Sequence, residues 1–428
     1  MTRPVAERVP LRVIAAQWGR LGCIGFGGPP AHIALLRKLV VDDRAWLDAR
    51  EFEDGVAAVN LLPGPASTQL TIYCAWRLRG MAGGLVGGAC FILPGLAVIL
   101  ALAGVFLAEH PPGWIAGAAL GAGSAVPVVA LATALGLVPP SWRRAGATGY
   151  ARARWLGYLL AGGTAAALVG PWLVGVLVGC GLIEAGLRSR PPPPPAPSAP
   201  PAPSAPPAPS APPAPSAPPA PPPAVMLAPV ATGAAAATTT TTTATAAAAG
   251  TAGLASLAWL AFKVGALSFG GGFVIIPLMQ HDAVLTYHWM SAGQFLTAVA
   301  LGQVTPGPVV QTVAVVGYAA AGVGGGLLAS LVVFAPSFCF VLGGGRYFDR
   351  LRGSAGVQAF LTGAGPAAIG AIAGSAIPLT ASLVHLWQAG VLALAGVWLI
   401  ALRRGVVTTI VGAAALGVLV YLAGGPAG

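Results

Sequence analysis

The chain has 428 residues, of which 56% are hydrophobic and only 8% carry a charge. A soluble domain carries about 25% charged residues, so this composition excludes a water-soluble globular protein and predicts an integral membrane protein. The net charge of +11 comes largely from arginines at the ends of apolar runs, which is typical of cytoplasmic loops. No basic stripe with interleaved aromatic residues indicates a nucleic-acid partner.

The predicted elements are membrane helices rather than barrel strands, because the apolar runs are long. The first, residues 11–28, has no convincing cleavage site, so we expect it to be a retained membrane segment and not a signal peptide. The fold class is therefore all-α. Further apolar runs cover 82–108, 113–138, 155–187, 322–344, 357–379, 385–402 and 406–424.

Glycine and proline interrupt two apolar stretches of the first half, at "FGGPP" (26–30) and within "NLLPGPASTQL" (60–70). Proline inside a helix costs about 3 kcal/mol or more. In lipid, the freed backbone groups are tolerated only where they are buried in protein or line a cavity. A helix that restarts after the break presents free N–H groups and a positive dipole end, which attract anions. At Phe-Gly-Gly, close helix packing is an equal alternative.

A charged segment at 37–54 separates these breaks and is predicted to be mostly a solvated loop. Glu53 and Asp54 lie where the chain re-enters the apolar run, and they are candidates for proton coupling. His32 follows the first break. It could donate to an anion or carry a proton, and a hydrogen-bonded core histidine is an equal alternative.

Proline, alanine and serine make up nearly all of residues 191–223, which predicts an extended, solvated spacer. The Ala/Thr tract that follows is either disordered or a weak extra span at 224–249. The predicted organisation is a first repeat at 1–187, a linker at 188–252 and a second repeat at 253–428.

The two halves resemble each other when the sequence is shifted by 243 residues, so that Gly22 falls on Gly265. The register also aligns Trp46 with Trp289 and repeats the Phe-Gly-Gly and Pro-Gly-Pro breaks. Such matching indicates an internal duplication. Broken helices at corresponding positions of two membrane repeats predict a substrate site at the repeat interface.

Arg20 and Lys263 occupy corresponding positions before the Phe-Gly-Gly breaks. An ionisable residue at membrane depth is by default a site candidate, and two cations favour an anionic substrate; snorkelling to the interface is the alternative. The candidate substrate-binding residues are these cations, His32, and the break residues with their polar neighbours: Arg20, Phe26, Gly27, Gly28, His32, Asn60, Pro63, Gly64, Pro65, Ser67, Thr68, Gln69, Lys263, Phe269, Gly270, Gly271, Gln303, Thr305, Pro306, Gly307, Pro308, Gln311 and Thr312.

The distribution of arginine predicts that the halves have opposite orientations. In the first half, the arginines at 77–79, 143–154 and 188–190 fall on the side of the basic N-terminus, which the positive-inside rule makes cytoplasmic. In the second half, those at 346–352 and 403–404 lie inside only if that half enters from outside. An odd number of crossings must then precede it, and the Ala/Thr tract is the available extra span.

Four segments carry a resemblance to the chromate ion transporter family: "FGGPPAHIALLRKLVVDDRAWLDAREF", "NLLPGPASTQL", "SFGGGFVIIPLM" and "GQVTPGPVVQTVAVVGY". The resemblance implies a bacterial inner-membrane protein with two homologous domains of opposite orientation. It also implies export of chromate, a tetrahedral divalent oxyanion, driven by the proton-motive force and conferring chromate resistance. The expected partners are chromate or a similar oxyanion and the lipid bilayer, with a homodimer as a further option.

Three alternatives remain open at this point. Sulfate or another tetrahedral oxyanion could replace chromate, and an anion channel would share the broken helices. A membrane-embedded enzyme such as a chromate reductase would need a redox site, which the five cysteines do not offer at any ligand or redox spacing. No nucleotide-binding loop is present, and we expect no cofactor, no metal and no catalytic residues.

Overall fold

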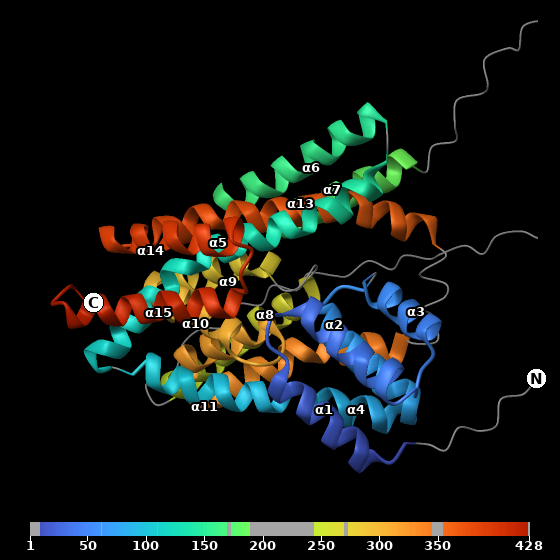
Figure 1. Cartoon of the computed structure of the whole chain (residues 1–428), viewed down its shortest axis with the longest axis horizontal. Helices are drawn as coiled ribbons and strands as arrows, with labels where there is room; N and C mark the ends of the chain where they lie inside the picture. The colour runs from blue at the N-terminus through green and yellow to red at the C-terminus, as the bar shows by residue number, and fades with distance from the viewer. Residues whose placement is uncertain are drawn as a thin grey trace, which may run out of the picture.

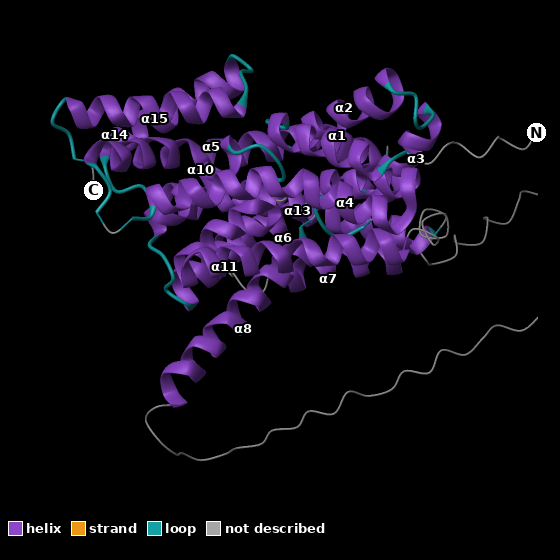
Figure 2. Ribbon diagram, turned by 90° about the horizontal axis from the view of Figure 1, so that it is seen from below, coloured by secondary structure: helices purple, strands orange, loops and turns teal. Residues whose placement is uncertain are grey.

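The computed structural model describes residues 9–60, 62–108, 110–146, 148–168, 173–188, 244–268, 273–344 and 354–426. Within these ranges every regular element is a helix of the α, 3-10 or π type, and none is a strand (Figure 2). Four of the described helices are long and apolar enough to cross a membrane: Ala66–Phe106, Gly113–Ala145, Val309–Gly343 and Ala355–Ala381. The predicted all-α, multi-pass membrane architecture is confirmed.

The first half begins with short helices and continues with long ones. Each break falls between two elements, and the apolar run at 155–187 divides between the last two. In chain order the elements are α1 (Leu11–Ile24), α2 (Pro29–Arg37), the π-helix η1 (Lys38–Asp43), α3 (Ala49–Val59), α4 (Ala66–Phe106), α5 (Gly113–Ala145), α6 (Gly149–Leu168) and α7 (Leu173–Arg188).

The second half follows the same plan. Its elements are α8 (Ala244–Leu267), η3 (Phe273–Ile275), α9 (Ile276–Gln280), the π-helix η4 (His281–Thr286), α10 (Ala292–Val304), η5 (Val309–Gln311), α11 (Thr312–Phe338), η6 (Cys339–Gly343), α13 (Ala355–Ala381), α14 (Leu386–Gly396), η8 (Val397–Ala401) and α15 (Val406–Leu422). Residues 244–249 of the Ala/Thr tract begin α8, and the rest of the suggested span lies outside the described residues.

The backbone repeats at the same offset of 243 residues that aligns the two sequences. The π-helices η1 and η4 correspond residue for residue, and each precedes a non-glycine residue of positive φ, Ala45 at 47° and His288 at 52°. Asp48 and Ser291 cap the helices that follow. Positive φ is uncommon outside glycine, so its recurrence at one register position confirms the duplication.

The Pro-Gly-Pro break of the first half lies at the tip of a helical hairpin. Helix α4 bends back on itself at Gly80, where φ is 63°. An ion pair between Arg77, shortly before this bend, and Glu51, in the first turn of α3, shows that these two ends lie together. Helix α3 and the first part of α4 therefore form a hairpin, and Pro-Gly-Pro is its tip. Helix α11 bends in the same way at Gly322, where φ is 60°.

The two halves interlock rather than lie side by side. Helix α4 packs against its repeat mate α11, and α5 packs against its mate α13. Beyond this central contact, α5 of the first half packs against α15, whereas α13 of the second half packs against α6 and α7 (Figure 1). Each half therefore completes the core of the other, which brings the breaks of both halves together.

Candidate functional site

The breaks of the two halves touch each other. The backbone N–H of Gly307, in the second Pro-Gly-Pro, donates to the carbonyl oxygen of Gly25 at 2.9 Å. Gly28 faces Val309, because a Cβ built on Gly28 would lie 3.9 Å from the Val309 Cγ2 atom. Gly28 and Gly307 have φ of 75° and 101°, values that only glycine adopts freely. These tips need glycine to form.

A cavity of about 560 Å³ lies beside this junction and is lined by both repeats. The first repeat contributes Gly27, Gly28 and Asn60, and the second contributes Gln303 and Val309. Asn60 and Gln303 correspond in the duplicated sequence, and their amides can donate hydrogen bonds to an oxyanion. The structure therefore brings together sequence-predicted residues of both breaks around one cavity.

Among the described helices, four begin at this cavity. Helix α2 begins at Pro29, α4 at Ala66, the 3-10 turn that continues into α11 at Val309, and α15 at Val406. All four residues line the cavity. The start of α4 has no side-chain cap, so the N–H groups of its first turn have no side-chain acceptor. Helix N-termini carry a partial positive charge that favours anions.

Arg403 and Arg404 also line the cavity, and sequence reasoning missed this role because it assigned both to topology. They lie in the turn between η8 and α15, with φ of 51° at Arg403 and the Arg404 guanidinium 5.9 Å from the Trp398 ring centroid. Residues 386–401 span about 24 Å at 1.5 Å per residue, less than the ~30 Å hydrocarbon core. The hairpin of α14, η8 and α15 is therefore too short for its turn to reach the far surface of the membrane, and the turn lies at membrane depth. The shortness of this apolar run was visible in the sequence.

The polar residues after each Pro-Gly-Pro lie behind the tips and not on the cavity wall. The Gln69 side-chain amide donates to the Pro63 carbonyl oxygen at 2.6 Å, and that of Gln311 to the Ile92 carbonyl oxygen at 2.7 Å. The Thr312 hydroxyl donates to the Val309 carbonyl oxygen at 2.8 Å. Gln69 and Thr312 stabilise the broken backbone, because freed carbonyls inside a membrane protein need donors. Gln311 instead binds a carbonyl within α4, and Ser67 and Thr68 are buried.

The other tip residues also form the breaks rather than the wall. Gly64 has φ of 119°, and the Thr305 hydroxyl donates to the Leu301 carbonyl oxygen at 2.9 Å. The flanking prolines are buried or half-buried: Pro63, Pro65, Pro306 and Pro308. Phe26 is exposed at the surface. Phe269, Gly270 and Gly271 lie outside the described residues.

His32 is a buried, hydrogen-bonded residue that supports the junction. Its Nε2 lies 2.9 Å from the Gly25 carbonyl oxygen, the same oxygen that accepts from Gly307. The ring stands at 88° to that of Phe91, with centroids 5.2 Å apart. His32 therefore lies in the core beside the junction and not on the cavity wall, and its role in transport stays a prediction.

The charged candidates lie away from the cavity. Arg20 is exposed on α1, and Lys263 forms an ion pair with the buried Asp282. Glu53 lies on the charged rim, 3.4 Å from Arg37, and its side chain is 65% exposed. Asp54 is half-buried on α3. The positive charge at the cavity therefore comes from Arg403 and Arg404 rather than from Arg20 and Lys263.

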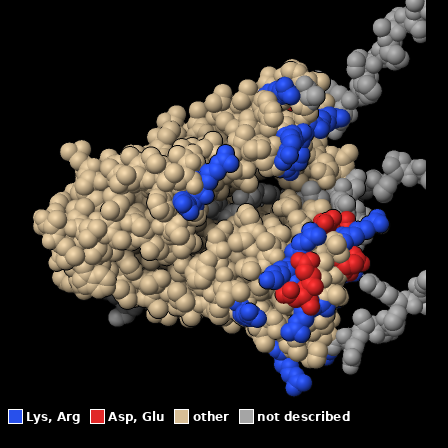
Figure 3. Space-filling model, viewed as in Figure 1, with Lys and Arg blue, Asp and Glu red and all other residues tan. Residues whose placement is uncertain are grey.

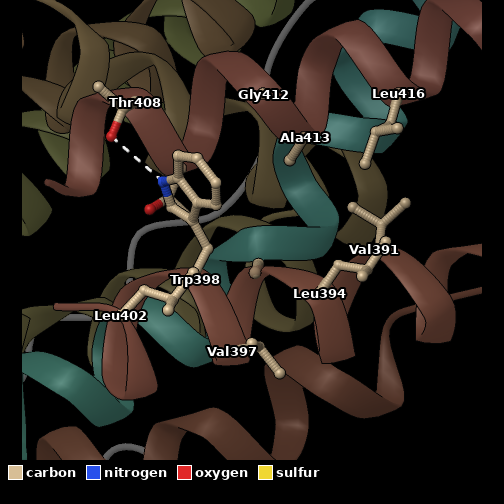
Figure 4. A pocket seen from close by; sticks show the side chains of 11 residues that line it. Val391, Leu394, Val397, Trp398, Leu402, Thr408, Gly412, Ala413 and Leu416 are labelled. Atoms are coloured by element: carbon tan, nitrogen blue, oxygen red, sulfur yellow. Dashed lines mark hydrogen bonds between the residues drawn. The ribbon is translucent and has the colours of Figure 1, made fainter. Parts of the chain in front are cut away.

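A second cavity, of about 480 Å³, lies between α14, η8 and α15 and is almost wholly apolar. Figure 4 shows Val391, Leu394 and Leu416 on its wall, with the Trp398 indole N–H directed at the Thr408 hydroxyl at 3.5 Å. Such a surface offers an oxyanion neither charge nor free donors. The described residues also contain no group of three or more His, Cys, Asp or Glu placed to hold a metal ion.

Comparison with known proteins agrees with this geometry. The family model of the chromate transporters matches residues 13–185 and 255–418, one match in each half.

The chain belongs to the chromate transporter family.

Relatives within the chromate transporters cover most of the chain. It is 28% identical to the chromate transport protein of Cupriavidus metallidurans, over 87% of this chain and 84% of the relative. It is 26% identical to a probable chromate transport protein of Synechococcus elongatus, over 96% of both chains. It is 30% identical to the chromate transport protein of Pseudomonas aeruginosa, over 85% and 80%. No solved structure matches this chain.

Proposed function

We propose that this protein is a secondary transporter that exports chromate across the bacterial inner membrane, driven by the proton-motive force, and so gives chromate resistance. The observation that carries the proposal is the cavity shared by both repeats, because two arginines, two side-chain amides and four helix starts converge on it. Two guanidinium groups balance the charge of a dianion and provide planar pairs of donors. The relatives named as chromate transport proteins supply the identity of that dianion.

The arrangement of charge supports opposite orientations of the repeats. Lys, Arg, Asp and Glu gather at the right-hand end of Figure 3, where α2 and α3 lie in Figure 1. Their repeat mates α9 and α10 lie further to the left, and the chain ends at the left. By the positive-inside rule the basic end is cytoplasmic. The hairpins of the first repeat then enter from the cytoplasm and those of the second from outside.

A transporter fits the junction better than an open channel. The tips of opposed hairpins meet at the Gly25 and Gly307 contact, so that protein closes the middle of the molecule on one side of the cavity. Inverted repeats with broken helices that meet at a central site are the architecture of alternating access. Relative movement of the two hairpin sets would expose the cavity first to one side and then to the other.

The test is the uptake of labelled chromate into everted membrane vesicles that hold the full chain. We expect a pH gradient, acid inside, to drive chromate accumulation, and a protonophore to abolish it. Excess sulfate distinguishes the substrates, because weak competition indicates a chromate transporter and strong competition a general oxyanion transporter. Uptake that only equilibrates chromate across the membrane, whatever the gradient, would identify a channel and contradict the proposal.

A further inference from the structure

A buried ion pair joins α8 to the π-helix η4 and has no part in the cavity. Asp282, in the π-helix η4, has a side chain that is 7% exposed, and one of its carboxylate oxygens pairs with the Lys263 ammonium on α8. The Lys263 ammonium also lies 5.9 Å from the Trp259 ring centroid. An ionisable pair buried in a membrane protein is costly to keep, which marks it as a functional candidate.

The pair is absent from the first repeat, although the backbone there is the same. The position that corresponds to Asp282 is Leu39, in η1, and the position that corresponds to Lys263 is Arg20. Leu39 is buried in the core and Arg20 is exposed. The fold therefore does not require a carboxylate at this place, and the ion pair serves something that only the second repeat does.

A route to the buried carboxylate exists on its other side. The His281 side chain is 30% exposed, and its Nδ1 lies 3.5 Å from the second carboxylate oxygen of Asp282. His281 lines a surface pocket of about 310 Å³ together with Gln280 and Ser382. Histidine accepts and releases protons near neutral pH, so it can pass a proton between this pocket and Asp282.

In the described structure, the elements packed around Asp282, Lys263 and His281 bring no other ionisable side chain into contact with them. Helices α9 and α10 pack against η4, and α13 packs against α9. None of these three helices has an ionisable side chain. Helix α6 also packs against α9, but its Arg154 and Tyr158 bind Glu184. Tyr287 follows η4, and its backbone N–H donates to the Asp282 carbonyl oxygen at 2.8 Å. Lys263 and His281 are therefore the ionisable side chains that contact Asp282 in the described structure.

We propose that Asp282 is the proton-binding residue of the transport cycle, with Lys263 as its counter-charge and His281 as the relay to the pocket. This inference rests on the proposed function, since it names the site that couples transport to protons. When a proton passes from His281 to Asp282, the N–H bond of the imidazolium breaks and an O–H bond forms on the carboxylate. The imidazole is then neutral and can take the next proton from the pocket, and the pair carries the single positive charge of Lys263. In the orientation proposed above, η4 faces the outside, from which the proton-motive force drives protons.

The pair is mechanically connected to the first Pro-Gly-Pro break. Two residues after Lys263, the Gly265 carbonyl oxygen lies 3.3 Å from the place where a Cβ on Gly64 would stand. Gly265 is itself pressed against α11, because its own Cβ would lie 2.0 Å from the Val333 carbonyl oxygen. If the ion pair broke and α8 shifted, the first Pro-Gly-Pro would move with it. Asn60 and Ala66, which flank this Pro-Gly-Pro in the sequence, line the cavity, so the shift would change the cavity wall.

The experiment uses the full chain in proteoliposomes and measures two kinds of chromate movement. Exchange of labelled for unlabelled chromate without a pH gradient needs no proton binding, whereas accumulation under an imposed gradient does. We expect Asp282→Asn to lose gradient-driven accumulation and to retain measurable exchange. The double variant Lys263→Gln with Asp282→Asn leaves no unpaired charge, and we expect it also to lose accumulation and retain exchange. Glu53→Gln, at the exposed acid, is the control and should keep both.

Infrared difference spectroscopy on acidification supplies a second, transport-independent readout. We expect the band of a protonated buried carboxyl in the wild type and its loss in Asp282→Asn. Accumulation that persists in either variant, loss of exchange in both, or a band unchanged by the substitution would overturn the inference. If the wild type shows the band but accumulates no chromate, then the proposed function fails while the proton site stands.

Discussion

The Gly307 N–H and the Gly25 carbonyl oxygen, 2.9 Å apart, join the second Pro-Gly-Pro break to the first Phe-Gly-Gly break. His32 Nε2 approaches the same carbonyl oxygen. The contact connects two hairpin tips that belong to different repeats and lie beside the shared cavity. Any movement that opens the cavity toward one side has to strain or break this bond, so the junction is where we expect substitutions to affect transport most.

Gly307→Ala should destabilise the junction, because Gly307 has φ of 101°. A left-handed conformation costs an L-residue about 1–2 kcal/mol. We expect a lower midpoint of thermal unfolding in detergent and a slower chromate flux. Gly424→Ala is the matched control, since Gly424 also has positive φ but faces open space at the end of the chain. Gly424→Ala should have a similar backbone cost but a normal chromate flux. If the two substitutions lowered the flux equally, the junction would not be what limits transport.

Arg404→Gln and Arg403→Asn should weaken chromate binding. Asn is chosen at position 403 because it tolerates positive φ. A hydrogen bond to a charged group is worth about 1.5–3 kcal/mol, so each variant should raise the chromate concentration for half-maximal flux by about ten- to hundredfold. Arg37→Gln, on the exposed rim, is the control. Unchanged concentration dependence in both cavity variants would remove the arginines from the substrate path.

Glu184→Gln should destabilise the bundle without touching the cavity. Glu184 on α7 is buried and accepts hydrogen bonds from Arg188 at 2.7 Å, Tyr158 at 3.1 Å and Arg154 at 3.2 Å. The neutral amide would leave two arginines without a counter-charge, at a cost of about 2 kcal/mol after allowance for their partial exposure. Thermal unfolding checks this. Glu53→Gln should change stability little, because surface pairs contribute about 0–1 kcal/mol.

Asp43→Cys and Thr286→Cys should label from opposite sides of the membrane. The two residues end the corresponding π-helices η1 and η4, and both are exposed. In a chain whose native cysteines are replaced, a membrane-impermeant thiol reagent should reach the cysteine at position 286 in intact cells and the one at position 43 only in everted vesicles. Labelling of both from one side would show that the repeats are parallel.

The sequence predicts the broken helices and the duplication well, because both follow from local sterics. Single prolines such as Pro94 and Pro127 are accommodated inside helices, but proline and glycine in direct succession interrupt a helix. The Pro-Gly-Pro and Phe-Gly-Gly positions are therefore visible without a fold. Asn60 and Gln303 are found by the same pattern, and the structure brings them to one cavity.

The remaining parts of the site depend on packing between distant segments. The turn that holds Arg403 and Arg404 reaches the breaks only because α15 packs against α5 of the other half. Lys263 looks free in the sequence, but the π-helix η4 brings Asp282 to it. Gln69 and Gln311 were predicted as anion donors, yet their amides donate to the Pro63 carbonyl oxygen of the break and the Ile92 carbonyl oxygen of α4.

Blocking the cavity tests most directly whether chromate passes through it. Gly136 on α5 lines the cavity, and Gly175 on α7 does not; both are helical glycines with nothing within 4 Å of the place where a Cβ would stand. Labelled chromate flux into everted vesicles should be abolished by Gly136→Trp and unaffected by Gly175→Trp, at equal levels of folded protein. Wild-type flux in Gly136→Trp would show that the substrate path lies elsewhere.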